Sequence, residues 1–277
     1  MKQLQDVKHL CLDLDGTLYL GATLFPFTKP FLASVRELGI GRTFFTNNSS
    51  RSTRQYVEKL NKLGIDATPD DIFSSTHCTL DYLRERHSHA KSAFVLGTPA
   101  LREEFQEHGY TADDKNPDLV IVGFDTTLSF DRVCRAAWWI SKGKPFIATH
   151  PDKTCPTDEP TVLPDCAAVC AMLMEATGRK PDAVLGKPDP RMLKGVMQRH
   201  NLRADQLAVV GDRIYTDMAM ARAAGAVGVL VLTGESTREQ ARTADPPPDL
   251  VVENVGELGA LLARGAEVPS PRLRGEG

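Results

Sequence analysis

The sequence predicts an α/β protein with a mostly parallel sheet, and three observations support this fold class. Short runs rich in β-branched residues and leucine alternate with longer segments whose apolar residues recur at helical spacing. Glycines close several of the helical segments, as expected where a helix ends. The chain has 277 residues, 42% of them hydrophobic and 25% charged, which is enough for one large domain or two modest ones.

The alternation occurs twice along the chain. The first series has strands at 7–12 and 42–46 and helices over 31–38, 52–63 and 76–86. From about residue 92 it begins again, with strands at 93–96, 119–122, 146–148, 183–185, 207–210 and 227–231 and helices over 99–108, 130–142, 166–177, 190–200 and 216–224. Composition does not decide whether the second series is inserted into the first or forms a separate domain. Residues 264–277 lack apolar periodicity and predict a loose tail.

Charge, cysteine content and the N-terminus narrow the class of protein. The chain has 33 Lys+Arg and 36 Asp+Glu, so no basic excess exists to hold a nucleic-acid backbone. The N-terminus has no apolar signal-peptide core, and the longest apolar stretches, such as 226–232, are too short to span a bilayer. Of the six cysteines, Cys166 and Cys170 lie at helical spacing in an apolar run, which indicates buried free thiols. We therefore expect a cytoplasmic protein that binds neither nucleic acid nor membranes.

The segment Leu12-Asp-Leu-Asp-Gly-Thr17 is the most informative about function. Asp13 and Asp15 directly follow the first predicted strand, and ligands of parallel α/β sheets bind outside the carboxyl ends of strands. Two carboxylates this close repel each other unless a cation neutralises them, and Mg²⁺ is the usual hard cation with oxygen ligands. Taken alone, the segment also fits a solvated acidic turn.

Three further segments strengthen the functional interpretation. Thr46 and Asn47 follow the second strand, where hydroxyl, amide and backbone N–H groups can hold phosphate oxygens, although a plain helix cap has the same pattern. Lys187 places one cation in a proline-stiffened turn, and a lone lysine is more often a surface residue. Asp212 and Asp217 follow a strongly apolar strand and can supply carboxylates at a metal, or Asp217 can cap and orient instead. Together the segments favour phosphoryl transfer through a metal-assisted aspartate.

In this order, the four segments resemble the signature motifs of the haloacid dehalogenase (HAD) superfamily of phosphohydrolases. The phrases TNNSSRS, ATxPD, ATGRKP, GKPDP and GDRxxTD are similar to the NagD/p-nitrophenylphosphatase group. The resemblance covers nearly all of residues 7–235. It implies a Rossmann-like parallel-sheet core formed by residues 1–77 and 181–263, with an α/β cap inserted at 78–180.

The resemblance also implies roles for the acidic residues. Asp13 would be the nucleophile that forms an aspartyl-phosphate. Asp15 would protonate the leaving alcohol and later deprotonate the attacking water. Mg²⁺ would be held by the carboxylates of Asp13 and Asp212 and by the backbone carbonyl of Asp15.

The phosphate-binding residues follow from the same resemblance. Thr46, the Asn47 backbone and Lys187 would hold the transferring phosphoryl group. Asp217 would support Lys187 or a metal-bound water. The implied activity is Mg²⁺-dependent hydrolysis of small phosphate monoesters.

Two positions depart from the pattern of the group. His150 stands where the group commonly has Asn, and Ala167 stands where it often has Gly, in a cap loop near the entrance. Both changes fit neutral drift at packed turns. They equally fit an altered substrate-contacting loop in which His150 adds a switchable charge. We expect these positions to affect the choice of substrate rather than the mechanism.

Two other activities were weighed against a phosphatase. A binding or regulatory module without turnover is disfavoured because Asp13, Asp15, Lys187 and Asp212 are all present. A dehalogenase is disfavoured because an acid/base at Asp15 and an acidic metal site are unnecessary for displacing halide from carbon. No motif fixes the leaving group, so sugar phosphates, nucleotides, glycerol phosphates and pyridoxal phosphate all stay open. Caps in this group often pair, which implies a homodimer.

Overall fold

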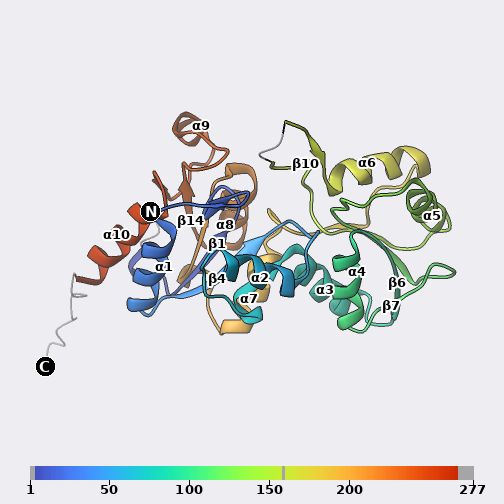
Figure 1. The fold of residues 1–277 in the computed structure, drawn as a ribbon, viewed down its shortest axis with the longest axis horizontal. Helices are drawn as coiled ribbons and strands as arrows, with labels where there is room; N and C mark the ends of the chain where they lie inside the picture. Colours follow the sequence, from blue (N-terminus) through green and yellow to red (C-terminus); the bar gives the residue numbers. More distant parts are fainter. Residues whose placement is uncertain (1–3, 158–159, 268–277) are drawn as a thin grey trace, which may run out of the picture.

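The computed structural model describes residues 4–157 and 160–267. Two sheets with parallel strand pairing organise the chain (Figure 1), a six-stranded sheet in the order β15-β14-β13-β1-β4-β5 and a five-stranded sheet in the order β12-β9-β8-β6-β7. We call the six-stranded sheet with its helices the core, and the five-stranded sheet with α4, α5 and α6 the cap. The α/β class predicted from the sequence is confirmed.

The core strands are short, apolar and buried. They are β1 (His9–Asp13), β4 (Gly41–Thr46), β5 (Ile72–Ser74), β13 (Leu207–Gly211), β14 (Val227–Val231) and β15 (Leu250–Val252). Every residue of β1 is buried, as expected of a parallel strand with helices on both faces. Alternate side chains of β1 enter opposite apolar clusters, with Leu10 and Leu12 on one face and Cys11 on the other.

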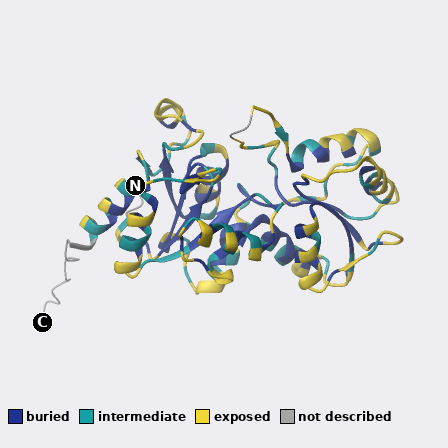
Figure 2. Cartoon of the chain, viewed as in Figure 1, coloured by how far each residue is buried: buried dark blue, intermediate teal, exposed yellow. Residues whose placement is uncertain are grey.

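Helices cover both faces of the core sheet. The core helices are α1 (Thr28–Glu37), α2 (Thr53–Lys62), α3 (Ser75–Arg86), α7 (Arg191–His200), α8 (Ala219–Ala224), α9 (Arg238–Thr243) and α10 (Val255–Glu267). Residues of α1, α2 and α10 pack in the cluster with Leu10, and residues of α3, α7 and α8 pack in the cluster with Cys11. Figure 2 shows the central strands of both sheets buried and the exposed residues mostly on the outer sides of the helices and in the loops.

The cap repeats the same construction on a smaller scale. Its strands and helices are β6 (Ser92–Leu96), α4 (Pro99–Glu107), β7 (Thr111–Ala112), β8 (Leu119–Val122), α5 (Phe130–Ser141), β9 (Phe146–Ala148), α6 (Cys166–Thr177) and β12 (Ala183–Val184). Two short antiparallel ribbons, β2–β3 (Tyr19–Leu20 and Thr23–Leu24) and β10–β11 (Thr154–Cys155 and Leu163–Pro164), extend from core and cap respectively. Single turns form η1 (Leu4–Asp6), η2 (Pro69–Asp71) and η3 (Ala204–Gln206).

The chain leaves the core sheet after β5 and rejoins it only at β13, so the second βα series lies within the first. The borders between core and cap expected from the sequence lie at 77/78 and 180/181. Residue 78 falls inside α3, which continues from β5 without a break, and β12 pairs with β9 in the cap sheet. One apolar cluster runs from Cys11 of the core through Leu80 of α3 to Ile121 of the cap, so the two sheets share packed side chains.

Two local expectations differ from the structure. The helix expected over 216–224 is a π-helical turn, η4 (Ile214–Met218), followed by α8. A loose tail was expected from residue 264, but residues 264–267 belong to the last turn of α10. Residues 268–277 lie outside the described residues. The buried thiols expected at Cys166 and Cys170 are found. None of the helices in the described part of the chain is long and apolar enough to cross a membrane.

Candidate active site

Asp13 is the last residue of β1 and lies at the carboxyl edge of the core sheet. Its side chain is nearly buried, and Thr17 Oγ1 donates to Asp13 Oδ2 at 3.3 Å. The tight turn that follows needs Gly16, whose φ of +83° lies in the left-handed region. A Cβ atom there would also lie 2.6 Å from Asp212 Oδ2, so the glycine lets the loops after β1 and β13 approach each other.

Lys187 lies between two carboxylates. Its Nζ donates to Asp13 Oδ1 and, at 2.8 Å, to Asp217 Oδ1, and all three side chains are buried. Burial raises the pKa of Asp13, the Lys187 ammonium opposes this shift, and Asp217 and Asp212 reinforce it. Burial disfavours the Lys187 ammonium, but Asp13 and Asp217 outweigh that effect and raise the pKa of Lys187. The lysine therefore keeps its charge beside Asp13.

Asp212 directly follows β13 and has one oxygen with a protein partner and one without. Its Oδ2 accepts a hydrogen bond from the backbone N–H of Glu235 at 2.7 Å. Its Oδ1 is buried and has no hydrogen-bond partner among the described residues. Burial and the nearby Asp217 raise the pKa of Asp212. A buried carboxylate oxygen left unpaired beside other carboxylates fits a hard divalent cation, which takes oxygen ligands and favours the ionised forms.

Thr46 ends β4 and Asn47 begins the loop after it, at the same edge of the sheet. Thr46 Oγ1 accepts from the backbone N–H of Asn48 at 3.2 Å. The Asn47 side chain pairs with the Lys187 backbone: Lys187 N donates to Asn47 Oδ1 at 2.6 Å, and Asn47 Nδ2 donates to Lys187 O at 3.0 Å. The helix that follows begins at a capping box between Ser52 and Gln55, which fixes the end of this loop.

Asp15 is partly exposed, unlike Asp13. Burial raises the pKa of the Asp15 carboxyl, and the ammonium of Lys59 works against that rise. A carboxyl with a raised pKa holds its proton closer to neutral pH, which is what a general acid requires. Two carboxyl groups two positions apart thus have different surroundings, Asp13 against Lys187 and Asp15 near Lys59.

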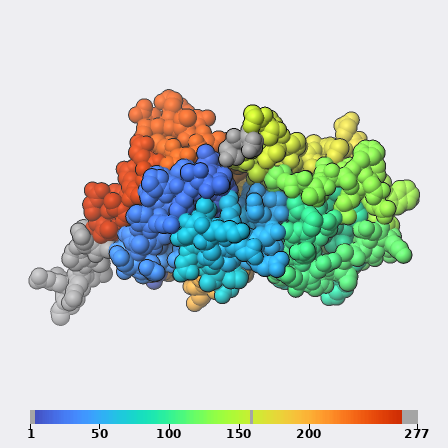
Figure 3. Space-filling model, in the orientation of Figure 1, coloured from blue at the N-terminus to red at the C-terminus, as the bar shows by residue number. Residues whose placement is uncertain are grey.

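Two adjoining cavities lie between core and cap. The small cavity, of about 50 Å³, is lined by Asp13, Asp15, Thr46, Asn47 and Lys187 together with cap residues. The large cavity, of about 870 Å³, opens beside it and includes Asp15 and Asp212 in its lining. It lies where the yellow-green part of the cap meets the blue and orange parts of the core (Figure 3).

Several lining residues are not among those predicted from the sequence. Asp152, Cys155 and Arg213 line both cavities, and Glu235 lines the large one. Arg213 Nε lies 2.9 Å from Glu235 Oε2, and Tyr215 OH donates to Glu235 Oε1 at 2.6 Å. Arg213 directly follows Asp212, a predicted metal ligand, in the fourth motif. This position in the sequence was a signal that could have identified Arg213 as a residue near the site. Asp152 lies on the cap loop after β9 and Cys155 lies in β10, and neither has a comparable signal.

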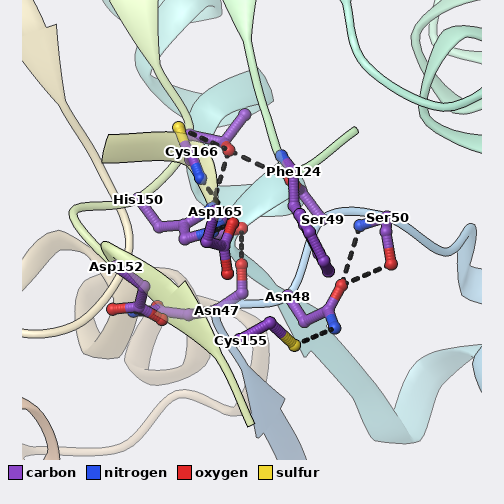
Figure 4. Close-up of polar contacts among 12 residues, drawn as sticks. Asn47, Asn48, Ser49, Ser50, Phe124, His150, Asp152, Cys155, Asp165 and Cys166 are labelled. Carbon is purple, nitrogen blue, oxygen red and sulfur yellow. Dashed lines mark hydrogen bonds and ion pairs between the residues drawn. The ribbon is translucent and has the colours of Figure 1, made fainter. Parts of the chain in front are cut away.

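His150 and Ala167, the two positions that depart from the group pattern, line neither cavity. The His150 ring is fully buried, with Nε2 2.8 Å from Asp165 Oδ1 and Nδ1 2.8 Å from Thr149 Oγ1 (Figure 4). The backbone N–H of Ala167 donates to the carbonyl of Asp152 at 2.9 Å. Burial works to lower the pKa of His150, but the Cys166 sulfur and the Asp165 carboxylate outweigh it and raise the pKa to about 9. Both positions therefore brace a loop next to the cavities.

Comparison with known proteins identifies the family of this chain. Residues 10–111 match the family model of haloacid dehalogenase-like hydrolases, and residues 184–258 match the HAD-hydrolase-like model. Ribonucleotide monophosphatase NagD of Escherichia coli K12 is 31% identical over 92% of this chain and 99% of its own length.

Solved structures agree with these matches. The 4-nitrophenylphosphatase of Thermotoga maritima superposes with a TM-score of 0.89 and 40% identity, covering 93% of this chain and 98% of that one. The glycerol phosphate phosphatase of Mycobacterium tuberculosis, solved in complex with calcium, gives a TM-score of 0.84 and 31% identity, covering 92% and 75%.

A core-and-cap α/β fold with this carboxylate and lysine arrangement defines a phosphoric monoester hydrolase. The chain belongs to the haloacid dehalogenase-like hydrolases, and within them it is a NagD-like phosphatase. The family resemblance expected from the motifs is confirmed.

Proposed function

We propose that the protein hydrolyses small phosphate monoesters through an aspartyl-phosphate on Asp13, with Mg²⁺ as its cofactor. The observation that carries this proposal is the small cavity, where Asp13 meets the Lys187 ammonium and lies close to Asp212 with its unpaired oxygen. The carboxylates of Asp13 and Asp212 and the backbone carbonyl of Asp15 would hold the cation. When bound, Mg²⁺ supplies positive charge that offsets the repulsion between the phosphoryl group and the carboxylates.

In the first half-reaction, a carboxylate oxygen of Asp13 attacks phosphorus and the bond to the leaving oxygen breaks. Asp15 gives its proton to that oxygen, consistent with its raised pKa. Lys187, Thr46 and the backbone of Asn47 hold the phosphoryl oxygens during transfer. In the second half-reaction, ionised Asp15 takes a proton from water, which attacks phosphorus and releases phosphate and free Asp13.

Asp217 has a supporting role in this scheme. Its Oδ1 accepts from Lys187 Nζ at 2.8 Å, while its Oδ2 accepts from the backbone N–H of Arg213 at 3.3 Å. Because both oxygens are occupied, Asp217 orients Lys187 and leaves the cation to Asp212. A lysine held from two sides loses little conformational freedom when the phosphoryl group arrives.

The proposed substrate is a small phosphorylated metabolite. The large cavity of about 870 Å³ has room for a leaving group of metabolite size beside the small one. Relatives are named for ribonucleotide, 4-nitrophenyl and glycerol phosphates, which supports a broad class of monoesters. We further propose a cytoplasmic enzyme that acts on neither nucleic acid nor membranes. Exposed Phe130 and Trp138 on α5 support pairing of two caps in a homodimer.

A colourimetric assay with p-nitrophenyl phosphate tests the proposal directly. Turnover should require Mg²⁺ after exhaustive treatment with chelator, and Asp13→Asn should abolish it. A panel of phosphorylated metabolites then ranks the leaving groups by kcat/KM. Absence of turnover on every ester in the presence of Mg²⁺ would overturn the proposed function.

A further inference from the structure

Asn47 connects the cap to the backbone of the catalytic lysine. Its amide Nδ2 donates to Lys187 O at 3.0 Å and also approaches both carboxylate oxygens of Asp152, at 3.2 and 3.3 Å. Asp152 belongs to the cap loop between β9 and β10, whereas Asn47 and Lys187 belong to the core. Figure 4 shows Asp152 and Asn47 side by side at this junction. One side-chain amide thus bridges a cap carboxylate and the segment that carries Lys187.

The orientation of the Asn47 amide is fixed by its partners. The backbone nitrogen of Lys187 can only donate, so the amide oxygen has to face it, at 2.6 Å. The amide NH₂ group then points to Lys187 O and Asp152, which both accept. Asn47 and Lys187 are buried. If the Asn47 amide lost an acceptor, bulk water could replace that acceptor only at a cost in free energy.

The backbone at position 186 is built for this approach. Gly186 has a φ of +74°, and a Cβ atom there would lie 2.8 Å from Asn47 Oδ1 and 2.8 Å from His150 Cβ. Only glycine therefore lets the turn before Lys187 contact the core loop and the cap loop together.

The cap loop that carries Asp152 is held in place by contacts with the start of α6. His150, two residues before Asp152, is fixed through its Nε2 to Asp165 Oδ1 at 2.8 Å. The carbonyl of Asp152 accepts from the backbone N–H of Ala167, in the first turn of α6. Asp165 also caps this helix by accepting from Cys166 N at 2.5 Å. The position of the Asp152 carboxylate is thus set by the start of α6.

We propose that Asp152 is a positioning residue for the chemical step: by holding the Asn47 amide, it fixes the Lys187 backbone and so places the ammonium against Asp13. This inference rests on the proposed function and assigns a part of the cap to the catalytic apparatus. It differs from a division in which the cap only selects the substrate and the core alone performs the chemistry. A displacement of about 1 Å in such a group can cost about 10²-fold in rate.

The test compares Asp152→Leu with Asp152→Asn, two replacements of similar volume. The Asn variant keeps a carbonyl acceptor for Asn47, and the Leu variant removes it. Leu should lower kcat about 10- to 100-fold on p-nitrophenyl phosphate and on alkyl phosphates alike, because every ester uses Lys187. Asn should keep kcat within about 3-fold, and inhibition by inorganic phosphate should weaken in the Leu variant alone.

Glu104→Gln serves as the matched control. Glu104 is a buried cap carboxylate that accepts from Thr53 N at 3.0 Å and from Thr53 Oγ1, so it joins cap to core without reaching Lys187. Its replacement should leave kcat unchanged even if the melting temperature falls. Asp152→Ala is the second variant should the Leu protein fail to fold, and thermal unfolding checks each one.

Three results would overturn the inference. An unchanged kcat in the folded Leu or Ala variant overturns the inference. A change confined to KM for bulky esters also overturns it, because Asp152 would then be a substrate contact. Loss of kcat in both Glu104→Gln and Asp152→Leu would show general cap docking rather than positioning of Lys187, and would overturn it as well. If the unaltered enzyme hydrolyses no ester, the proposed function itself fails.

Discussion

Gly234 packs against the Asp212 carboxylate so closely that a Cβ atom at position 234 would overlap Oδ2 and lie 2.5 Å from Cγ. The neighbouring Glu235 N–H donates to that same Oδ2, which leaves Oδ1 as the free oxygen. The loop after β14 therefore decides which oxygen of Asp212 faces the site. Such close approach of backbone to a carboxylate is available only to glycine.

We expect Gly234→Ala to weaken cation binding. The added methyl group has to displace the Asp212 carboxylate or the loop itself, since neither can overlap it. The Mg²⁺ concentration for half-maximal activity should rise by roughly 10-fold or more, corresponding to about 1.4 kcal/mol. Gly265→Ala in α10 is the control, because apart from the helix's own backbone no atom of the described residues lies within 4 Å of the new Cβ. Equal Mg²⁺ titration curves for the two variants would contradict this role of Gly234.

Removal of the divalent cation should abolish turnover and lower the melting temperature. Burial and mutual repulsion raise the pKa values of Asp13 and Asp212, and a cation bound only to the folded state offsets that cost. Differential scanning fluorimetry in EDTA and in millimolar Mg²⁺ measures the shift. Full activity in EDTA, or identical melting curves, would speak against the proposed metal site.

Changing Asp13 or Asp15 to Asn should impair the reaction in different ways. Asp13→Asn removes the nucleophile, so no phosphoryl-enzyme forms. Asp15→Asn keeps the nucleophile and the backbone carbonyl at position 15 but removes the proton donor, typically worth about 10²–10⁴-fold. In single-turnover experiments, that loss should be smaller for an aryl phosphate than for an alkyl phosphate, since an aryl leaving group needs little protonation. Equal losses on both esters would remove Asp15 from the acid role.

His150 should stabilise the fold in a pH-dependent manner. Its folded-state pKa of about 9 lies above the ordinary value of 6.5, with Asp165, Cys166 and Asp152 around the ring. A group with a raised pKa contributes its full stability below about pH 6.5, and the contribution is lost as pH rises through about 9.

Urea unfolding of the native protein and of His150→Asn measures this contribution. The difference in unfolding free energy should be about 3 kcal/mol at pH 6, the scale for breaking a buried charge pair, and should shrink by pH 9.5. A difference that stays constant over this range would show that the ring is held by packing and neutral hydrogen bonds alone.

The sequence could predict where the candidate site residues lie on the fold, because each of them lies at a strand end or in a turn at one edge of the sheet. Asp13 ends a fully buried strand and Asp212 directly follows another, and parallel pairing of β1 with β13 brings the ends of the two strands together. Periodicity thus placed both carboxylates without any knowledge of side-chain contacts.

Features that depend on docking of cap and core could not be predicted in this way. Asp152 meets Asn47 across 105 positions of sequence, and no local pattern encodes how a cap loop lies on a core loop. The same holds for His150, whose ring is turned to Asp165 rather than to the cavities. The C-terminal helix α10 was missed because Gly256, Gly259 and Gly265 lower its helix propensity, and its apolar face compensates by packing in the core.

The order of the strands along the chain also determines when the residues of the candidate site come together during synthesis. β1 lies between β4, which emerges soon after it, and β13, which emerges only after the whole cap. Asp13 and Lys187 are 174 positions apart, and Asp212 comes later still. A nascent chain therefore displays its acidic loop long before the ammonium and the partner carboxylate exist, and ribosome-bound intermediates carry no complete phosphoryl site. Under the proposed function, a chain must have emerged beyond Asp212 before it carries every residue proposed to hold the phosphoryl group and the cation.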